Sequence, residues 1–96
     1  MSSYILAPLA RQDLEQIWDR IAEDDFDTAD RVVEEIRTAI LRLSARPLIG
    51  HVRRDLAPPH FRFWPIYSYL IIYRPDTSPL EVVRVWHGAQ DKPRLL

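Results

Sequence analysis

The C-terminal third of the chain contains two strand-like runs, residues 67–74 and 80–87, joined by the short polar loop from Pro75 to Pro79. The first run is rich in aromatic and β-branched side chains, which favour a central strand. A loop of this length predicts that the two runs pair as an antiparallel hairpin. Alternation along the second run predicts Val83, Val85 and His87 on one face, and Val82, Arg84 and Trp86 on the other. Such a hairpin needs an apolar layer to cover it, and the preceding residues must supply that layer.

Two amphipathic helices are predicted before the hairpin. The first runs from Pro8 to about Asp24, since a proline costs no hydrogen bond in the first turn of a helix. The second is capped by Asp25 or Asp27 and stops just before Pro47, which disfavours helical torsions in the preceding residue. Apolar side chains recur at helical spacing in both: Leu9, Leu14, Ile17, Trp18 and Ile21, then Ala29, Val32, Val33, Ile36, Ile40 and Leu43. Each helix therefore has one apolar face to bury, and Trp18 is predicted to lie in the core.

Shorter segments complete the predicted fold. Residues 4–6 form a first strand, and residues 60–64 form another that Pro65 places at a sheet edge or a bulge. Residues 47–59 form an irregular connection. The order strand–helix–helix–strand–strand–strand predicts a two-layer α+β fold, with the helical hairpin packed on an antiparallel sheet. The length, without repeats or linkers, predicts a single domain over residues 1–96.

The composition excludes several kinds of site. The chain has no cysteine, which excludes disulfides and thiolate metal sites, and its three histidines share no ligand spacing. With two glycines it has no glycine-rich phosphate loop, and we expect neither a metal nor a cofactor. The N-terminus lacks the features of a signal peptide, and no run approaches about 20 apolar residues. We therefore expect a cytoplasmic protein without a membrane span.

Charge is distributed unevenly along the chain. Residues 1–36 carry ten acidic side chains and three arginines, whereas residues 37–96 carry ten basic and four acidic side chains. Arginine pairs bidentately with carboxylates, and arginine and tryptophan often anchor protein interfaces. We predict that these side chains of the second half bind a macromolecular partner: Arg54, Arg62, Trp64, Arg74, Arg84, Trp86 and Arg94.

The predicted strands suggest how some of these arginines are arranged. Arg62 and Arg74 are expected at opposite ends of neighbouring strands, so that with Arg84 they form a positive patch across the sheet. The alternative is a solvated face with local ion pairs to three acidic residues, Asp55, Asp76 and Glu81. Direct nucleic-acid binding is less favoured, because the acidic first half repels phosphate over a long surface.

Several segments, taken together and in order, resemble the RelE/ParE toxins of type II toxin–antitoxin systems. They are residues 4–10, Asp13-Leu14, Ile17-Trp18, the pair Pro47 and Gly50, residues 68–74 and residues 83–88, and the resemblance spans residues 4–91. The strand from Tyr69 to Arg74, followed by the run from Arg84 to Gly88, is most similar to the ParE branch. The resemblance implies two N-terminal helices on an antiparallel sheet. It also implies a ParD-like antitoxin partner with a ribbon-helix-helix DNA-binding part.

The ParE-like and RelE-like branches of this family differ in their target. ParE-like members poison DNA gyrase and have no accepted catalytic residues, whereas RelE-like members cleave messenger RNA in the ribosome. RNA cleavage through the 2′-hydroxyl needs a proton acceptor, a proton donor and cations at the phosphate. Leu70 stands where RelE-type members place a central-strand arginine, and Ala89 and Gln90 follow the last strand in place of their arginine and tyrosine or histidine. We therefore expect a gyrase inhibitor that acts by binding and is not an enzyme.

Two other functions stay open. The first is a RelE-like ribosome-dependent endoribonuclease with His87, Arg62 and Arg84 at its site, although His87 is predicted to be a packed, hydrogen-bonded side chain. The second is an inactive member of the family that survives as a structural partner in an antitoxin complex.

Overall fold

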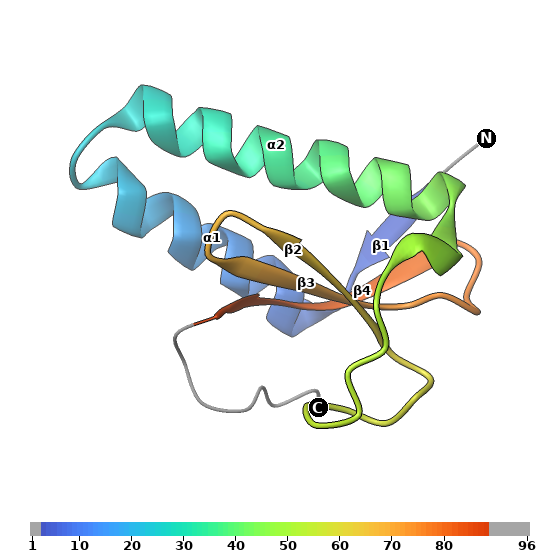
Figure 1. Cartoon of the computed structure of the whole chain (residues 1–96). Coiled ribbons are helices and arrows are strands. Elements are labelled where there is room, and N and C mark those ends of the chain that lie inside the picture. The colour runs from blue at the N-terminus through green and yellow to red at the C-terminus, as the bar shows by residue number, and fades with distance from the viewer. Residues whose placement is uncertain (1–2, 89–96) are drawn as a thin grey trace.

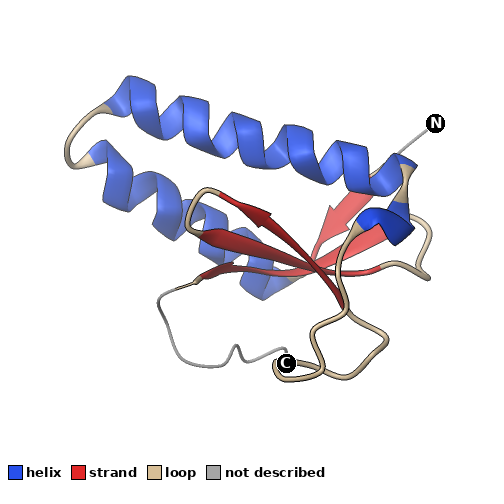
Figure 2. Ribbon diagram, in the orientation of Figure 1, coloured by secondary structure: helices blue, strands red, loops and turns tan. Residues whose placement is uncertain are grey.

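The computed structural model of the chain describes residues 3–88 as two helices packed on one face of a four-stranded sheet (Figures 1 and 2). The elements are β1 (Tyr4–Leu6), α1 (Pro8–Ala22), α2 (Phe26–Ala45), the 3₁₀ turn η1 (Pro47–Ile49), β2 (Arg62–Ile66), β3 (Tyr69–Arg74) and β4 (Leu80–His87). The predicted order of elements and the two-layer α+β architecture are confirmed.

The helix ends follow local chemistry. Pro8 occupies the first turn of α1, and α1 ends at Ala22, two residues before the predicted end at Asp24. Asp25 caps α2: its Oδ1 accepts from the backbone N–H of Asp27 at 3.3 Å, and its Oδ2 accepts from the Thr28 hydroxyl at 2.5 Å. The hydrogen bond from Thr28 and those from the backbone lower the pKa of Asp25. Of the two predicted caps, Asp25 is therefore the one used.

The sheet is mixed rather than purely antiparallel, which corrects the prediction. Its strand order is β1-β4-β3-β2, in which β2–β3 and β3–β4 are antiparallel and β1–β4 are parallel. The chain leaves β1, passes through both helices, and enters the meander at the far edge of the sheet. The last strand, β4, therefore returns to the side of β1 in the same direction.

The edge strand β2 starts at Arg62 and extends through Pro65 to Ile66, so the predicted range of 60–64 was placed two residues too early. Pro65 lies on the sheet edge, as predicted, where its missing N–H breaks no ladder hydrogen bond. The outward-facing N–H and C=O of Phe63 are both bonded to the backbone of His51, at 2.8 Å each. This edge is therefore partly closed to pairing with another strand.

A β-bulge in β4 changes which side chains share a face. Ile72 lies opposite Arg84, whereas the next residue, Tyr73, lies opposite Val82, so Val83 has no partner in the register. Val82 consequently packs with Val85 in the helix-facing core, and Val83 lines a groove beside Phe61. The predicted faces were wrong for Val82 and Val83, and correct for Val85, Arg84 and Trp86, because strict alternation cannot include the extra residue.

The main core lies between the helices and the sheet. Its largest fully buried members are Tyr73, Ile36, Ile40, Leu43, Ile71 and Val82. On the opposite face, Phe63 and Ile72 form a smaller cluster with Ala57 of the connecting loop. The sheet is therefore covered on both faces at the end nearest that loop.

Candidate functional site

The predicted positive patch is not formed on one face of the sheet. Arg62 pairs with Tyr73, the neighbour of Arg74, so Arg62 and Arg74 lie at the same end of β2 and β3. They were predicted at opposite ends, because the antiparallel register could not be fixed from the sequence. Side chains alternate along a strand, so Arg62 shares the helix-facing side with Tyr73, and Arg74 points to the other side.

Arg62 belongs to a cluster that holds the η1 turn against the sheet. Its Nη1 donates to the carbonyl oxygens of Gly50, at 2.8 Å, and Leu48, at 3.3 Å. The buried Tyr73 hydroxyl donates to the Pro47 carbonyl at 2.7 Å and accepts from the Gly50 N–H at 2.9 Å. Burial raises the pKa of Tyr73, opposed by the Gly50 hydrogen bond and by the charge of Arg62. The Nη1 group of Arg62 is thus already engaged in hydrogen bonds within the chain.

Arg84 forms an ion pair with Asp13 of α1 that the sequence did not reveal. Its Nε and Nη2 donate to the two Asp13 carboxylate oxygens at 2.7 and 2.8 Å, and the Val85 N–H donates to Asp13 at 2.9 Å. Asp13 is 8% exposed, and the Arg84 side chain 12%. The hydrogen bonds to Asp13 raise the pKa of Arg84. The carboxylate binds β4 just beyond the three-residue strand β1, where no strand of residues 3–88 pairs with that edge.

The two predicted tryptophans of the sheet lie in different surroundings. Trp86 is on the face away from the helices, half-buried, with the Arg84 guanidinium 4.8 Å from its ring centroid. Trp64 packs against the helix-facing core and stacks on His51, with ring centroids 6.0 Å apart. The sheet therefore does not present the two rings as one surface.

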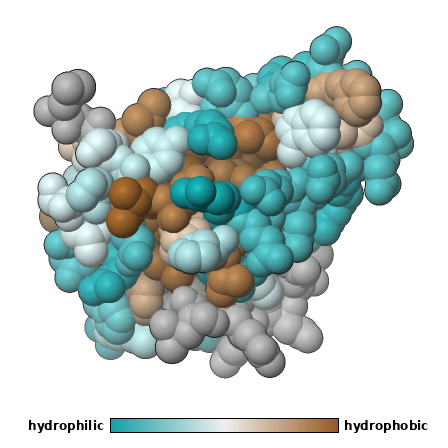
Figure 3. Space-filling model, turned by 180° about the vertical axis from the view of Figure 1, so that it is seen from behind, coloured by the Kyte–Doolittle hydropathy of each residue, from teal (hydrophilic) through white to brown (hydrophobic). Residues whose placement is uncertain are grey.

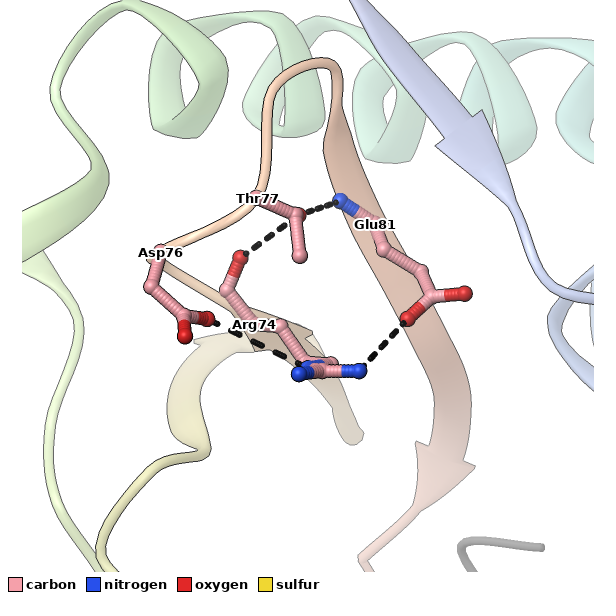
Figure 4. Close-up of polar contacts among 4 residues, drawn as sticks. All are labelled: Arg74, Asp76, Thr77 and Glu81. Atoms are coloured by element: carbon pink, nitrogen blue, oxygen red, sulfur yellow. Dashed lines mark hydrogen bonds and ion pairs between the residues drawn. The ribbon is translucent and has the colours of Figure 1, made fainter.

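Arg74 lies between two acidic side chains at the start of the β3–β4 loop. Its Nε is 3.9 Å from Asp76 and its Nη1 is 3.7 Å from Glu81 (Figure 4). The Thr77 hydroxyl donates to the Arg74 carbonyl and accepts from the Glu81 N–H, which fixes the loop. Arg53 pairs similarly with Asp55 at 2.9 Å. The local ion pairs considered as the alternative to docking are thus present.

The remaining two members of the predicted set are Arg54 and Arg94. Arg54 is exposed in the loop before β2. Arg94 lies outside the described residues. The predicted partner-binding role of the set stays a prediction.

His87 is partly exposed at the end of β4, where its ring meets Tyr69 edge-on with centroids 5.4 Å apart. It lines a cavity of about 30 Å³ together with Asp13 and Arg20. Of the other two residues of the nuclease hypothesis, Arg84 is bonded to Asp13 of this cavity, whereas Arg62 is distant from it. Arg62 lies beside Tyr73, whereas His87 lies beside Tyr69, four residues or about 13 Å away along β3.

A groove on the helix side was missed by the sequence analysis. It has a volume of about 440 Å³ between α1, α2 and β1, with Leu6, Leu14, Val33 and Trp18 among its lining residues. Trp18 was predicted in the core, but it is half-buried: its ring stacks on Phe26 with centroids 5.8 Å apart, and its Nε1 donates to Asp30 at 2.8 Å. Helical periodicity indicates an inward face, but it cannot show where two helices diverge.

Within residues 3–88, no group of three or more histidine, cysteine or acidic side chains could hold a metal ion. The helices of this range are also too short or too polar to cross a membrane.

Comparison of the sequence with known proteins identifies its family. Residues 4–92 match the family model described as the ParE toxin of the type II toxin–antitoxin system parDE. The chain is 34% identical over 97 residues to Toxin ParE1 from two strains of Mycobacterium tuberculosis, CDC 1551 / Oshkosh and ATCC 25618 / H37Rv, covering 99% of this chain and 98% of each relative.

A solved structure described as the chromosomal ParDE TA system from P. aeruginosa matches with a TM-score of 0.74 at 18% identity, over 91% of this chain and 96% of that one. At this level of identity, the match supports the shared fold. The family model and the relatives go further, because they cover nearly the whole sequence. The chain belongs to the ParE toxin family of type II toxin–antitoxin systems.

Proposed function

We propose that this chain is a toxin that inhibits DNA gyrase by binding, and that a ParD-like ribbon-helix-helix antitoxin neutralises it. Membership of the ParE family and the name of the M. tuberculosis relatives support a toxin paired with an antitoxin. The ParE-like sequence of the last two strands supports gyrase as the target. Such a target places the toxin in the cytoplasm.

One observation supports binding over RNA cleavage: both arginines proposed for a nuclease are bonded within the chain, and Arg62 lies far from His87. Arg62 is bonded to the carbonyls of Leu48 and Gly50, and Arg84 to the carboxylate of Asp13. General acid–base chemistry at a phosphate needs such groups within hydrogen-bond reach of one substrate. His87 lies opposite Tyr69 and Arg62 lies opposite Tyr73, so these two side chains are at opposite ends of β3.

The proposal is tested with purified proteins. Folded toxin is added in excess to gyrase and supercoiled plasmid, and the products are separated on gels with and without the antitoxin. We expect the toxin to block supercoiling and to accumulate cleaved DNA, and the antitoxin to abolish both effects. Unchanged supercoiling at excess folded toxin contradicts the proposal.

The second candidate is the ribosome-dependent endoribonuclease, favoured by the partly exposed His87 beside Arg20. Its cavity has the volume of a single water molecule rather than a nucleotide. This candidate predicts codon-positioned cuts in a translated message, and the loss of those cuts in a folded His87→Ala variant. Induced expression without growth arrest would instead favour an inactive partner of an antitoxin complex.

A further inference from the structure

We propose that the groove lined by Phe61 and Val83, hereafter the outer groove, holds the target of this toxin. It takes a bulky apolar side chain of gyrase next to a neutral hydrogen-bond acceptor. The outer groove has a volume of about 410 Å³. The inference rests on the proposed inhibition of gyrase and adds which surface of the toxin makes the contact.

The β-bulge in β4 creates one wall of the outer groove. The extra residue in the strand lets Val83 line the groove, while Val82 stays in the helix-facing core. Phe61 forms a second wall, and Pro8 and Leu9 at the start of α1 form a third. Residues from three distant segments thus enclose an apolar recess, with the volume of a pocket that holds a small ligand or a few side chains.

Exposed apolar surface does not by itself identify a binding site on this molecule. The view from behind shows apolar side chains at several places between hydrophilic ones (Figure 3). The outer groove differs because one of its lining residues, Arg74, has a buried Nε without a hydrogen-bond partner within residues 3–88. Buried donors are rarely left unsatisfied. The Arg74 side chain is 41% exposed, so rotation of its guanidinium group can present this donor to a bound chain.

The charges around Arg74 indicate the chemistry of the occupant. Its Nη1 is 3.7 Å from a Glu81 carboxylate oxygen and its Nε is 3.9 Å from one of Asp76, too far for hydrogen bonds (Figure 4). Two carboxylates therefore already balance the single positive charge. A further anion would be repelled by them, whereas a backbone carbonyl satisfies the free donor without adding charge.

The same charges distinguish between the two components of a gyrase–DNA complex. DNA presents phosphates, which Asp76 and Glu81 repel. The outer groove therefore fits the protein component. Its occupant is a segment of gyrase with an exposed aromatic side chain or methionine, the apolar types enriched at interfaces, and with a backbone carbonyl facing Arg74.

The first test fills the groove. Ala7 lines it and is half-buried, so Ala7→Phe would occupy the recess with a side chain of the toxin itself. Ala45→Phe, the same substitution at the exposed end of α2, is the matched control. Inhibition of supercoiling is titrated after thermal melting has shown that each variant is folded. We expect Ala7→Phe to require at least about tenfold more toxin than the wild type, and Ala45→Phe to stay within about twofold.

The second test removes the free donor and keeps the charge. Arg74→Lys retains a cation near Asp76 and Glu81 but has a carbon in place of Nε. Arg53→Lys is its control, because Arg53 is similarly exposed and is paired with Asp55. Loss of one hydrogen bond should weaken inhibition about three- to tenfold in Arg74→Lys and leave Arg53→Lys unchanged. If Ala7→Phe does not fold, this pair decides, because it leaves the apolar walls of the groove intact.

Binding of each variant to the antitoxin encoded beside the toxin completes the experiment. Inhibition at the wild-type level by folded Ala7→Phe overturns the proposed contact, and so does loss of antitoxin binding with inhibition retained. Equal inhibition by the two lysine variants overturns the neutral acceptor at Arg74. A folded wild-type toxin that never inhibits gyrase contradicts the proposed function itself, so the failures are distinguishable.

Discussion

At the residue scale, two polar clusters anchor loops and helices to the sheet. Asp13 neutralises Arg84 and bonds the Val85 N–H, while Tyr73 and Arg62 hold the residues around Gly50. Neither cluster was predicted, because each joins residues far apart in the sequence. The segments that resemble known toxins include Asp13, Gly50 and Tyr73, but the resemblance does not indicate what these residues contact.

Replacing Asp13 by alanine should destabilise the protein by about 3 kcal/mol, because the largely buried Arg84 charge loses its ion pair with Asp13 and the Val85 N–H loses its acceptor. Urea denaturation followed by circular dichroism measures the free energy of unfolding. Asp19→Ala, an exposed position on the same helix, is the control and should cost less than about 0.5 kcal/mol. Equal losses for the two variants would show that the ion pair contributes no net stability.

Gly50→Ala should cost about 1–3 kcal/mol through overcrowding. A Cβ at this position would lie 2.2 Å from the Tyr73 hydroxyl and 2.8 Å from its ring, which is fully buried and cannot move aside. Gly88→Ala is a milder comparison, since its Cβ would meet the Ser68 carbonyl at 3.1 Å. Thermal melting checks that Gly50→Ala is the more destabilised of the two variants. A Gly50→Ala protein as stable as the wild type would contradict the tight packing of Gly50 against Tyr73.

Stability should also fall at alkaline pH because of Tyr73. Burial raises its pKa above the ordinary value of 10.0, so the unfolded chain loses this proton at a lower pH than the native one. The stabilisation is complete below pH 10.0 and is lost as the pH rises through the native pKa.

Tyr73→Phe isolates this effect. The variant should be about 1–2 kcal/mol less stable at neutral pH, because the Gly50 N–H and the Pro47 carbonyl lose their partner. Its free energy of unfolding should then fall less steeply than that of the wild type above pH 10.0. Parallel pH profiles of the two proteins would assign the alkaline loss to other groups.

At the scale of elements, the sequence predicted what depends on local pattern. The stop before Pro47, the range of the last strand and the edge position of Pro65 were all correct, since each follows from torsions or periodicity of nearby residues. The parallel pairing of β1 with β4 and the bulge at Val83 were missed. Both depend on how distant segments align in the sheet, and one extra residue is invisible in an alternating pattern.

The apolar face of α2 can be tested by substitution. Ile36 is fully buried between α2 and the sheet, so Ile36→Asp should unfold the domain by burying an unpaired charge. Leu41→Asp, on the same helix at 47% exposure, should leave a cooperative thermal transition. A folded Ile36→Asp protein would show that the inward face of α2 is wrongly assigned.

At the scale of the whole molecule, the arginines of the two layers differ in how they are engaged. The sheet arginines are largely engaged by acidic side chains or backbone carbonyls, whereas the opening between the helices keeps apolar side chains and two arginines accessible. The sequence shows which positions are arginines, but not which of their guanidinium groups are already bonded within the chain. The opening between the helices depends on where they diverge, which the sequence did not show, whereas the family could be inferred from the order of short segments.

The central claim is that this toxin works by stoichiometric binding, and a titration tests it most directly. Toxin is varied from far below to above a fixed gyrase concentration in a coupled reaction that also contains a translated message. We predict that loss of supercoiling saturates at a fixed molar proportion of toxin to gyrase, is unchanged in His87→Ala, and leaves the message intact. Complete cutting of the message by toxin far below the ribosome concentration, with gyrase still active, would contradict the account.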